Sequence, residues 1–466
     1  MSKEFSIGVE GLDEIIGPLR APYTLLILGH PGAGKTTLAS TICYRNALRG
    51  RKSLYVTFYE NKEKLYENMR RVGLGLREVE EKGLFKFVKL PISTDVEPLI
   101  GELNKILGEG YEVVAVDTIN ALLEAVGGQA EKRAWLLNYF YQLPHAIDGL
   151  LVLVAELPLG AEALAASSLE FAVDAIVVLK HKIEDGFIVR KAEVRKARGA
   201  PLHLVEVHFS IVEGKGIVAH APPLLEEIPS EAEEVPLASS VLKEAAGHVH
   251  RGFVINYFHP PHLSGKQYIY YWLLALALKH KARILVISYT TPPQALYDVM
   301  LNALARRGVD RSLAEEEVKR RITIKALNPF AYSISELVYK ELGLIEDVKP
   351  DVVVFDGVHL PRATASQERH IKELFNEVLY LKSRGITVVR VGACIEGEEV
   401  CSREASISDL TVVKKEVYRE NRAEPVFYVY RRHSEPSIIG PEGVAKFVEE
   451  VLSAAVEAIQ SGQQQP

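Results

Sequence analysis

The sequence predicts an α/β protein built from two tandem domains, each a mostly parallel β-sheet flanked by helices. Short apolar runs alternate with polar stretches that are long enough for crossover helices, and this alternation is typical of a parallel sheet covered on both faces. The same plan recurs in the second half of the chain. The length of 466 residues also exceeds what one hydrophobic core usually supports.

The first predicted strand is the apolar run of residues 21–29, which ends in a glycine-rich turn. Residues 35–48 follow with apolar side chains at helical spacing, so the predicted order is strand, loop and helix. Further strands are predicted at the short apolar runs of residues 53–58, 113–116, 150–155 and 175–179. After Arg190 the pattern is typical of antiparallel strands that close the edge of a sheet.

Composition predicts the boundary between the domains. Residues 221–240 contain four prolines and five glutamates with little apolar periodicity, which favours an extended linker. This linker separates a first domain at residues 1–220 from a second at residues 241–440. Residues 441–466 are expected to form a helix that docks on the second domain, followed by a polar tail.

Composition also excludes several classes of protein. The formal net charge of −6 gives no general attraction for nucleic acid, so such a partner is not expected. No apolar stretch reaches the roughly 18 residues that a membrane span requires, and the N-terminal residues lack the blocks of a signal peptide. Cys43, Cys394 and Cys401 fit neither a disulfide framework nor a zinc pattern, so reduced thiols in a cytoplasmic protein are expected.

A phosphate-binding loop is the clearest motif in the chain. The segment GHPGAGKT matches the pattern G-x-x-x-x-G-K-[ST] and lies between the first predicted strand and helix, as phosphate binding requires. Glycines let backbone N–H groups turn toward phosphate oxygens, and the helix N-terminus adds its dipole. In such a loop Lys35 reaches the β- and γ-phosphates and the Thr36 hydroxyl binds Mg²⁺. The predicted nucleotide-binding residues are Gly29, His30, Pro31, Gly32, Ala33, Gly34, Lys35, Thr36 and Thr37.

Two acidic residues close predicted strands. Asp117 follows the strand of residues 113–116, where a carboxylate can hold the outer shell of a magnesium ion opposite Thr36. Glu60 closes the run SLYVTFYE and is the candidate general base that would polarise an attacking water. Each has a structural alternative, because strands commonly end in Asp and because Glu60 could instead cap a helix.

These motifs together resemble the KaiC and RadA branch of the RecA-like P-loop ATPases. The resemblance is carried by IGVEGLDEIIG, the phosphate loop, VTFYE, VDTIN and VRKARG, and it covers residues 5–220. It implies two tandem RecA-like domains, ATP and Mg²⁺ as ligands, and a homo-oligomer, with a hexameric ring as the expected form. It also implies that Lys196 and Arg198 act as fingers on the nucleotide of a neighbouring subunit, and the alternative is an exposed basic turn. The family often has two adjacent glutamates where this chain has Tyr59 and Glu60, which leaves one candidate base.

The second domain resembles the same fold with an incomplete phosphate loop. Its loop reads HPPHLSGKQ, and alignment places Pro260 at the first glycine and Gln267 at the magnesium-binding Ser or Thr. Proline removes a backbone donor, and an amide is a poor substitute for a hydroxyl ligand. Lys266 and Asp356 are retained, so weak or metal-free nucleotide binding stays open, whereas hydrolysis is not expected there.

Three further features of this domain are the two histidines of the loop, a pair of serines and a pair of arginines, and each is open to a functional and a structural interpretation. His259 and His262 suggest a metal site, but without a third ligand nearby a role in loop packing is favoured. Ser406 and Ser408 lie near the place where cyanobacterial clock KaiC proteins autophosphorylate adjacent Ser and Thr residues, but the adjacent pair is missing here. A phospho-clock role is therefore not expected. The two arginines of VYRRH are candidates for the remnant of a second finger.

The favoured function is a tandem KaiC-like ATPase. Its first domain would hydrolyse Mg-ATP, and its second domain would serve assembly or regulation, with an unidentified regulatory protein as a further partner. One alternative is a nucleotide-gated module that binds a partner protein with little or no hydrolysis. Another is a DNA-associated ATPase of the RadA or RadB type, against which stand the negative net charge and the lack of a long basic segment with interleaved aromatic residues.

Overall fold

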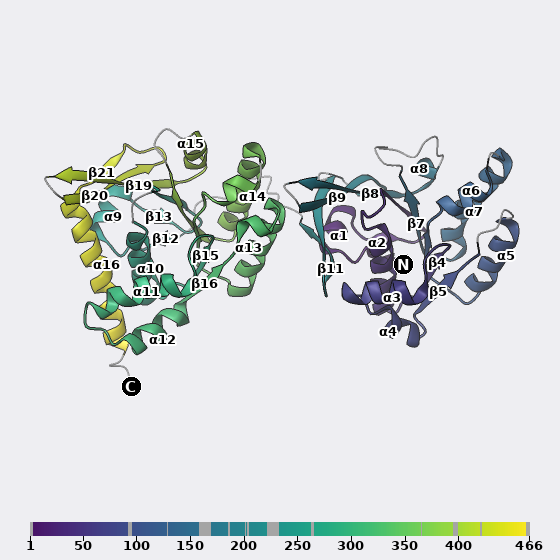
Figure 1. Ribbon diagram of the computed structural model, residues 1–466, viewed down its shortest axis with the longest axis horizontal. Coiled ribbons are helices and arrows are strands. Elements are labelled where there is room, and N and C mark those ends of the chain that lie inside the picture. The colour runs from purple at the N-terminus through teal and green to yellow at the C-terminus, as the bar shows by residue number, and fades with distance from the viewer. Residues whose placement is uncertain are drawn as a thin grey trace. The chain divides into compact units, whose positions relative to one another are not determined.

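The computed structural model describes residues 3–91, 96–127, 129–157, 169–184, 187–200, 202, 205–220, 233–261, 265–364, 366–394, 399–419 and 422–462. The chain forms two compact units, Met1–Ala221 and Pro222–Pro466. Both are of the α/β class, with a large and mostly parallel sheet between layers of helices, as the sequence predicts (Figure 1). None of the helices in the described residues is long and apolar enough to cross a membrane.

The first unit is built on a nine-stranded sheet within the described residues. Its strands are β3 (Tyr23–Gly29), β4 (Ser53–Thr57), β5 (Phe85–Lys89), β6 (Val113–Asp117), β7 (Leu150–Glu156), β8 (Ala175–Glu184), β9 (Phe187–Ala197), β10 (Glu206–Val212) and β11 (Gly216–His220). They lie in the order β11-β10-β9-β8-β3-β7-β6-β4-β5. Strands β3 to β8 run parallel, whereas β9, β10 and β11 form the predicted antiparallel edge.

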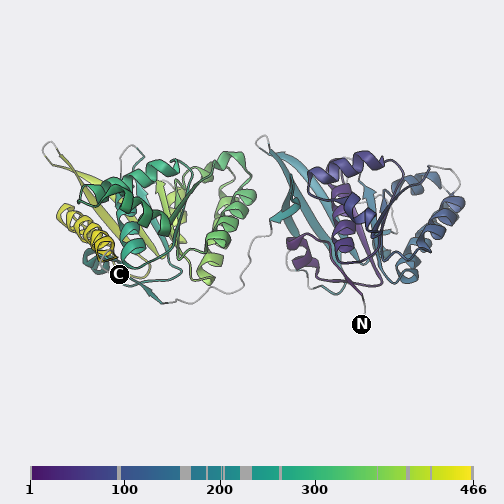
Figure 2. The ribbon, with the colours of Figure 1, turned by 90° about the horizontal axis from the view of Figure 1, so that it is seen from below.

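Helices cover both faces of this sheet (Figure 2). They are α1 (Glu10–Ile16), α2 (Lys35–Leu48), α3 (Lys62–Arg71), α4 (Leu76–Glu81), α5 (Val96–Leu107), α6 (Asn120–Ala125), α7 (Ala130–Ala146) and α8 (Leu169–Ala172). Helices α1 to α4 pack on the face that includes Leu25 and Ile27, and α5 to α7 pack on the face that includes Leu26 and Leu28. Because successive side chains of a strand point to opposite faces, the wholly apolar strand β3 is buried on both.

The second unit repeats this plan with an eight-stranded sheet in its described residues. Its strands are β14 (Val254–His259), β15 (Ile284–Ser288), β16 (Ile322–Ala326), β17 (Val352–Asp356), β18 (Thr387–Ala393), β19 (Leu410–Arg419), β20 (Arg422–Arg431) and β21 (Ser437–Ile439). The order β16-β15-β17-β18-β14-β19-β20-β21 matches that of the first unit, with β16 at the place of β5 and β21 at the place of β10. No strand among the described residues corresponds to β11. Each unit also starts with a small two-stranded sheet, β1 (Glu4–Phe5) with β2 (Leu19–Arg20) and β12 (Glu234–Val235) with β13 (Val249–His250). The tandem repeat is therefore confirmed.

Two helical layers also cover the second sheet. One contains α9 (Ser240–Ala246), α10 (Gln267–Lys279), α11 (Pro293–Ala305), α12 (Arg311–Arg321) and α16 (Pro441–Gly462). The other contains α13 (Ile334–Val348) and α14 (Gln367–Ser383), while the short elements η1 (Pro329–Ala331), η2 (Pro361–Thr364) and α15 (Glu399–Ser406) lie in the connections. Val444, Phe447 and Val451 of α16 are buried in the same cluster as α10.

The structure differs from the expectation at an edge strand of the first sheet and at the linker. Strand β5 is missed by the sequence pattern because FKFVK carries two lysines, which an edge strand with a partly exposed surface tolerates. The segment expected as a linker is shorter than residues 221–240, because β12 and Ser239, whose side chain caps α9, already belong to the second unit. Residues 221–232 lie outside the described part of the chain.

Candidate nucleotide site

The candidate site lies at the edge of the first sheet where its parallel strands end. In register, Gly29 of β3 lies beside Glu156 of β7, and Thr57 of β4 lies beside Asp117 of β6. The carboxyl ends of parallel strands form the usual ligand-binding edge of an open α/β sheet. The phosphate loop, the end of β4 and two carboxylates therefore lie on one edge.

Glycine is required at three positions of the loop for different steric reasons. A Cβ atom on Gly29 would lie 2.4 Å from the carbonyl oxygen of Leu179 on β8, so only glycine lets these strands pair up to their ends. Gly32 and Gly34 have φ angles of 78° and 105°, which side chains disfavour. With Gly34 as the N-cap of α2, the loop turns directly into the helix N-terminus, as phosphate binding requires.

The side chain of Lys35, the first residue of α2, folds back onto the phosphate loop. Its Nζ donates to the carbonyl oxygen of His30 at 3.0 Å and lies 3.7 Å from Oε1 of Glu156, and the side chain is only 7% exposed. Burial lowers the pKa of Lys35, and the charges of Glu156 and Asp117 partly oppose this shift. A buried cation whose strongest partner is a backbone carbonyl can exchange that partner for a phosphate oxygen.

Thr36 and Asp117 form a direct pair. The Thr36 hydroxyl donates to Oδ2 of Asp117 at 2.8 Å, and the Tyr55 hydroxyl donates to the same oxygen at 2.5 Å. Burial raises the pKa of Asp117, while these hydrogen bonds and the charge of Lys35 act in the opposite direction. A hydroxyl and a carboxylate are the oxygen ligands that Mg²⁺ prefers, so the residues present fit a magnesium ion that also binds phosphate.

Glu60 follows β4 on the same edge. Its backbone N–H donates to the Thr57 hydroxyl at 3.2 Å. The N-cap of α3 is Asn61, whose side chain accepts from the backbone N–H of Lys64, so Glu60 does not cap this helix. The capping alternative is therefore wrong.

Sequence analysis missed Glu156, Tyr55 and Asn120. Glu156 ends β7 between the phosphate loop and Asp117, and its backbone N–H donates to Oδ1 of Asn120 at 2.8 Å. A signal was available for Glu156, because the run LLVLVAE ends in an acid as the runs before Glu60 and Asp117 do. Asn120 follows Asp117 by only three residues, so its place at this edge could also have been inferred. For Tyr55 there was no signal, since the pairing of β4 with β6 brings it to Asp117.

Lys196 and Arg198 lie at the opposite edge of the sheet. Arg198 Nη1 pairs with Oδ1 of Asp174 at 3.0 Å, and the backbone N–H of Asp174 donates to the carbonyl of Thr24, near the start of β3. The Lys196 ammonium donates to the backbone carbonyls of Glu170 and Phe171, both at 3.2 Å. The length of β3, roughly 20 Å at the usual rise per residue, separates these residues from the phosphate loop of their own chain.

At the equivalent site of the second unit, the lysine and aspartate side chains bind each other. Lys266 Nζ lies 2.8 Å from Oδ1 of Asp356 and donates to the Thr290 hydroxyl at 2.9 Å. Asp356 is fully buried, and its other oxygen accepts from the Ser288 hydroxyl at 3.1 Å. The lysine and the aspartate therefore bind each other, whereas in the first unit the aspartate binds Thr36.

Strand register corrects the alignment of the second loop. The backbone N–H groups of Thr24 and Val254 donate to Asp174 and Asp409 in the same way, which places His259 rather than Pro260 at the position of Gly29. Pairing of β14 with β19 ends at Phe258, one residue earlier than in the first unit, where a side chain replaces the glycine hydrogen. Among the described residues no group of three or more His, Cys, Asp or Glu could hold a metal ion, and His262 lies outside them.

The same comparison locates the counterparts of the basic pair. The backbone N–H of Arg432 donates to the carbonyl of Asp409, as that of Arg198 does to Asp174. Tyr430 pairs with Thr411 as Lys196 pairs with Ile176. The second unit thus retains the arginine and has a tyrosine in place of the lysine.

The cysteine expectation is wrong for two of the three residues. Cys394 and Cys401 form a disulfide with a Cα–Cα distance of 6.3 Å, while Cys43 is a buried free thiol. Their separation of seven residues carries no disulfide signal, because the pair forms only where the end of β18 and the start of α15 lie side by side.

Comparisons with known proteins find similarity to the KaiC family of ATPases. The model of the family described as "ATPase: KaiC" matches residues 5–223. A UPF0273 protein of Pyrococcus horikoshii is 26% identical over 240 residues, which cover 48% of this chain and 97% of the relative. A UPF0273 protein of Aeropyrum pernix is 26% identical over 46% of this chain and 92% of its own length. The circadian clock protein KaiC3 of Synechocystis is 25% identical over 53% of this chain and 49% of its own.

Proposed function

Because the first unit belongs over residues 5–223 to the KaiC-like branch of the P-loop ATPases, we propose that it binds Mg-ATP at residues 29–37 and hydrolyses it. The observation that carries this proposal is the 2.8 Å hydrogen bond between Thr36 and Asp117. It brings a hydroxyl and a carboxylate together beside a loop that begins and ends in glycine. Lys35 supplies the matching cation.

In this proposal each residue at the edge of the sheet has a role in binding or hydrolysing the nucleotide. The backbone N–H groups of the loop hold the phosphates, and Lys35 exchanges its bond to the His30 carbonyl for a phosphate oxygen. When bound, Mg²⁺ neutralises charge on the phosphate oxygens. Thr36 and Asp117 hold it, and Glu60 orients a water and accepts its proton.

A neighbouring copy completes the site. Lys196 and Arg198 lie at the far edge of their own sheet, so they serve the phosphate loop of another chain. Phe171, which is 82% exposed, lies on the same edge beside the carbonyls that hold Lys196. Such a contact repeats head to tail, which is how a closed ring forms, and a hexamer is our expectation.

The second unit serves assembly or regulation in this proposal. Support comes from the ion pair of Lys266 with Asp356, which leaves neither group to a nucleotide, and from Gln267 in place of a hydroxyl ligand. Hydrolysis is therefore assigned to the first unit alone.

The decisive experiment measures phosphate release from Mg-ATP together with size on a sizing column. Lys35→Ala should abolish release, whereas Lys266→Ala, the matched change in the second unit, should retain it. Loss of release in both variants would contradict the assignment to the first unit. Bound nucleotide without release in the wild type would favour a nucleotide-gated binding module.

The action of the fingers in trans is tested by mixing variants. In an equal mixture of Lys35→Ala and Arg198→Ala, about a quarter of the interfaces combine an intact loop with an intact finger, so about a quarter of wild-type release should return. Arg195→Ala, which removes the nearby partner of Glu193, should hydrolyse as the wild type. Mixed oligomers without restored release would contradict action in trans.

A further inference from the structure

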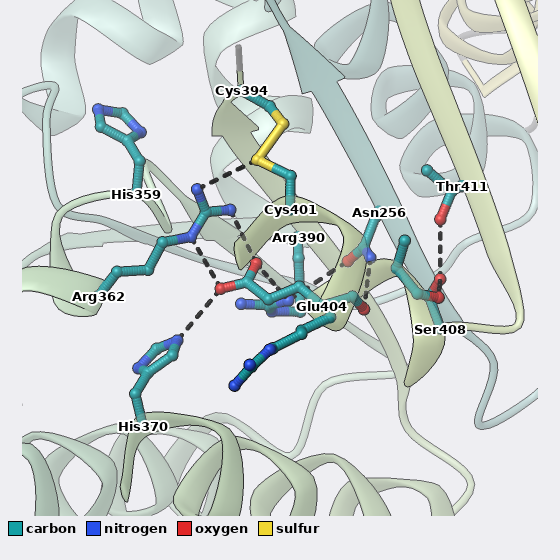
Figure 3. A network of polar contacts seen from close by, with 12 residues as sticks. Asn256, His359, Arg362, His370, Arg390, Cys394, Cys401, Glu404, Ser408 and Thr411 are labelled. Carbon is teal, nitrogen blue, oxygen red and sulfur yellow. Dashed lines mark hydrogen bonds and ion pairs between the residues drawn. A yellow bond between two sulfur atoms is a disulfide. The ribbon is translucent and has the colours of Figure 1, made fainter. Parts of the chain in front are cut away.

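A buried network of charges in the second unit centres on Glu404 of helix α15 (Figure 3). Arg362 binds its carboxylate with two hydrogen bonds, Nε to Oε1 and Nη2 to Oε2, both at 2.8 Å. Arg390 Nη1 lies 3.1 Å from Oε2, and His370 Nε2 lies 3.2 Å from Oε1. Although burial favours the neutral acid, Arg390, His370 and Arg362 together hold the pKa of Glu404 well below its ordinary range.

The Glu404 carboxylate contributes to the docking of helix α15. The helix has eight residues, and a helix that short is not stable by itself in water. Besides the ion network, the Glu404 carbonyl accepts from Nδ2 of Asn256 on β14 at 3.1 Å. The position of α15 therefore depends on contacts with β14, β18, α14 and η2.

The disulfide adds a second attachment at the preceding turn. Cys401 lies three residues before Glu404, so both side chains lie on neighbouring turns of one helix face. Cys394 directly follows β18. Arg362 Nη1 lies 3.7 Å from Sγ of Cys401, so the disulfide and the ion network share this arginine (Figure 3).

We propose that Cys394 and Cys401 form a reversible thiol–disulfide site that controls the docking of α15. In the oxidised form the disulfide adds a covalent attachment to the contacts of Glu404, and in the reduced form this attachment is lost while the contacts of Glu404 remain. The partner is a dithiol reductant. This proposal does not depend on nucleotide hydrolysis.

The thiol–disulfide exchange with the reductant proceeds in two steps. A thiolate of the reductant attacks Sγ of Cys394, which is the less buried sulfur, and Cys401 leaves as a thiolate and takes up a proton. The guanidinium of Arg362 beside Cys401 stabilises that thiolate. The second thiol of the reductant then closes its own disulfide and releases Cys394 as a thiol. Two electrons and two protons thus pass from the dithiol to the protein.

The end of α15 connects this site to the edge of the sheet. Arg432, the counterpart of Arg198, donates from Nη2 to the carbonyl of Ser406 at 2.7 Å. Asp409, three residues later, accepts from the backbone N–H of Val254 at the start of β14. Loosening of α15 would therefore remove this hydrogen bond of Arg432.

The test uses the full-length wild-type protein isolated without reductant and then treated with dithiothreitol under native conditions. Alkylation after denaturation should label one cysteine, Cys43, before this treatment and all three after it. Hydrogen exchange should rise on reduction in peptides that span α15, by about tenfold or more, and remain unchanged in α2.

Variants separate this site from a general effect of the reductant. Cys43→Ser should respond as the wild type, and the double variant Cys394→Ser/Cys401→Ser should exchange in both buffers as the reduced protein does. Arg362→Gln should slow native reduction. Three labelled cysteines without reductant, reduction that needs denaturant, or equal exchange in both states would each overturn the proposal.

Discussion

At the scale of single residues, two aspartates at the same place in two related sheets have different partners. Asp117 binds the hydroxyls of Thr36 and Tyr55, whereas Asp356 binds the ammonium of Lys266. Asp356 lacks both of these hydroxyl partners, because Gln267 replaces the hydroxyl of Thr36 and Val286 stands at the register position of Tyr55. A buried carboxylate that loses these partners needs a charge, and the loop lysine is the nearest one.

The first residue-scale prediction concerns Thr36→Val. This change removes the hydroxyl that donates to Asp117, and that we propose as a magnesium ligand, while it keeps the side-chain shape. We expect magnesium-dependent phosphate release to fall by on the order of 100-fold, with nucleotide still bound in the absence of metal. Thr41→Val is the matched control, because that hydroxyl only donates to a carbonyl of the same helix. An active Thr36→Val protein would contradict the metal site.

The second residue-scale prediction concerns the buried pair Glu341 and Glu377. Burial raises the pKa of Glu341 from 4.5 to about 7, against the hydrogen bonds from Tyr289 and Glu377. Because its pKa is raised in the folded state, the protonated Glu341 carboxyl contributes stability that is fully present below pH 4.5. This contribution is lost as the pH rises through about 7. The free energy of unfolding of the second unit should therefore fall as the pH rises over this range.

Glu341→Gln tests this pH dependence in urea unfolding at a series of pH values. The amide keeps the shape without titrating, so the slope of stability against pH should be at least halved. Glu442→Gln, an exposed change at the start of α16, should keep the wild-type slope. An unchanged slope in Glu341→Gln would mean that other groups carry the dependence.

At the scale of elements, the pairing of β3 with β8 decides where the phosphate loop starts. In the first unit this pairing reaches Gly29, whereas in the second unit the equivalent pairing of β14 with β19 stops before His259. A side chain at this position separates the strand ends, because the facing carbonyl of Leu179 leaves no room for a Cβ. One glycine therefore contributes both to the sheet and to the site.

The element-scale prediction concerns Gly29→Ala. The added methyl group clashes with backbone, so the first unit should lose about 1–3 kcal/mol of stability in denaturant unfolding. Nucleotide affinity should fall as well, because the loop starts from this strand end. Gly101→Ala within α5, where no atom lies within 4 Å of the new Cβ, should instead stabilise the unit by about 0.5–1 kcal/mol. Equal effects of both changes would contradict the steric argument.

At the scale of the whole molecule, each unit has its own pair of apolar layers around its own sheet. A unit with a complete core does not need its neighbour in order to fold. We predict that a fragment ending at Ala221 folds cooperatively and retains nucleotide binding. Circular dichroism with thermal unfolding tests this, and a fragment without a cooperative transition would show that the second unit supplies part of the fold.

Most of the first unit's fold could be predicted from local pattern. Strands β3, β4, β6 and β7 and helix α2 lie within two residues of their predicted ends, because apolar periodicity reports burial directly. Strand β5 was missed because its lysines face solvent at the sheet edge. The phosphate loop, Asp117 and the tandem repeat were also evident, since each is a motif or a recurrence along the chain.

Local sequence pattern was thus enough to predict the two α/β units, the intact loop in the first and the incomplete loop in the second. Only the tertiary structure decided that Glu156 pairs with Lys35, that Lys266 binds Asp356, and that Cys394 and Cys401 are joined. It also decided that Lys196 and Arg198 lie at the far edge from their own loop. The physical reason is that periodicity and motifs act over a few neighbouring residues, whereas these contacts depend on strand order and register between residues far apart in the chain.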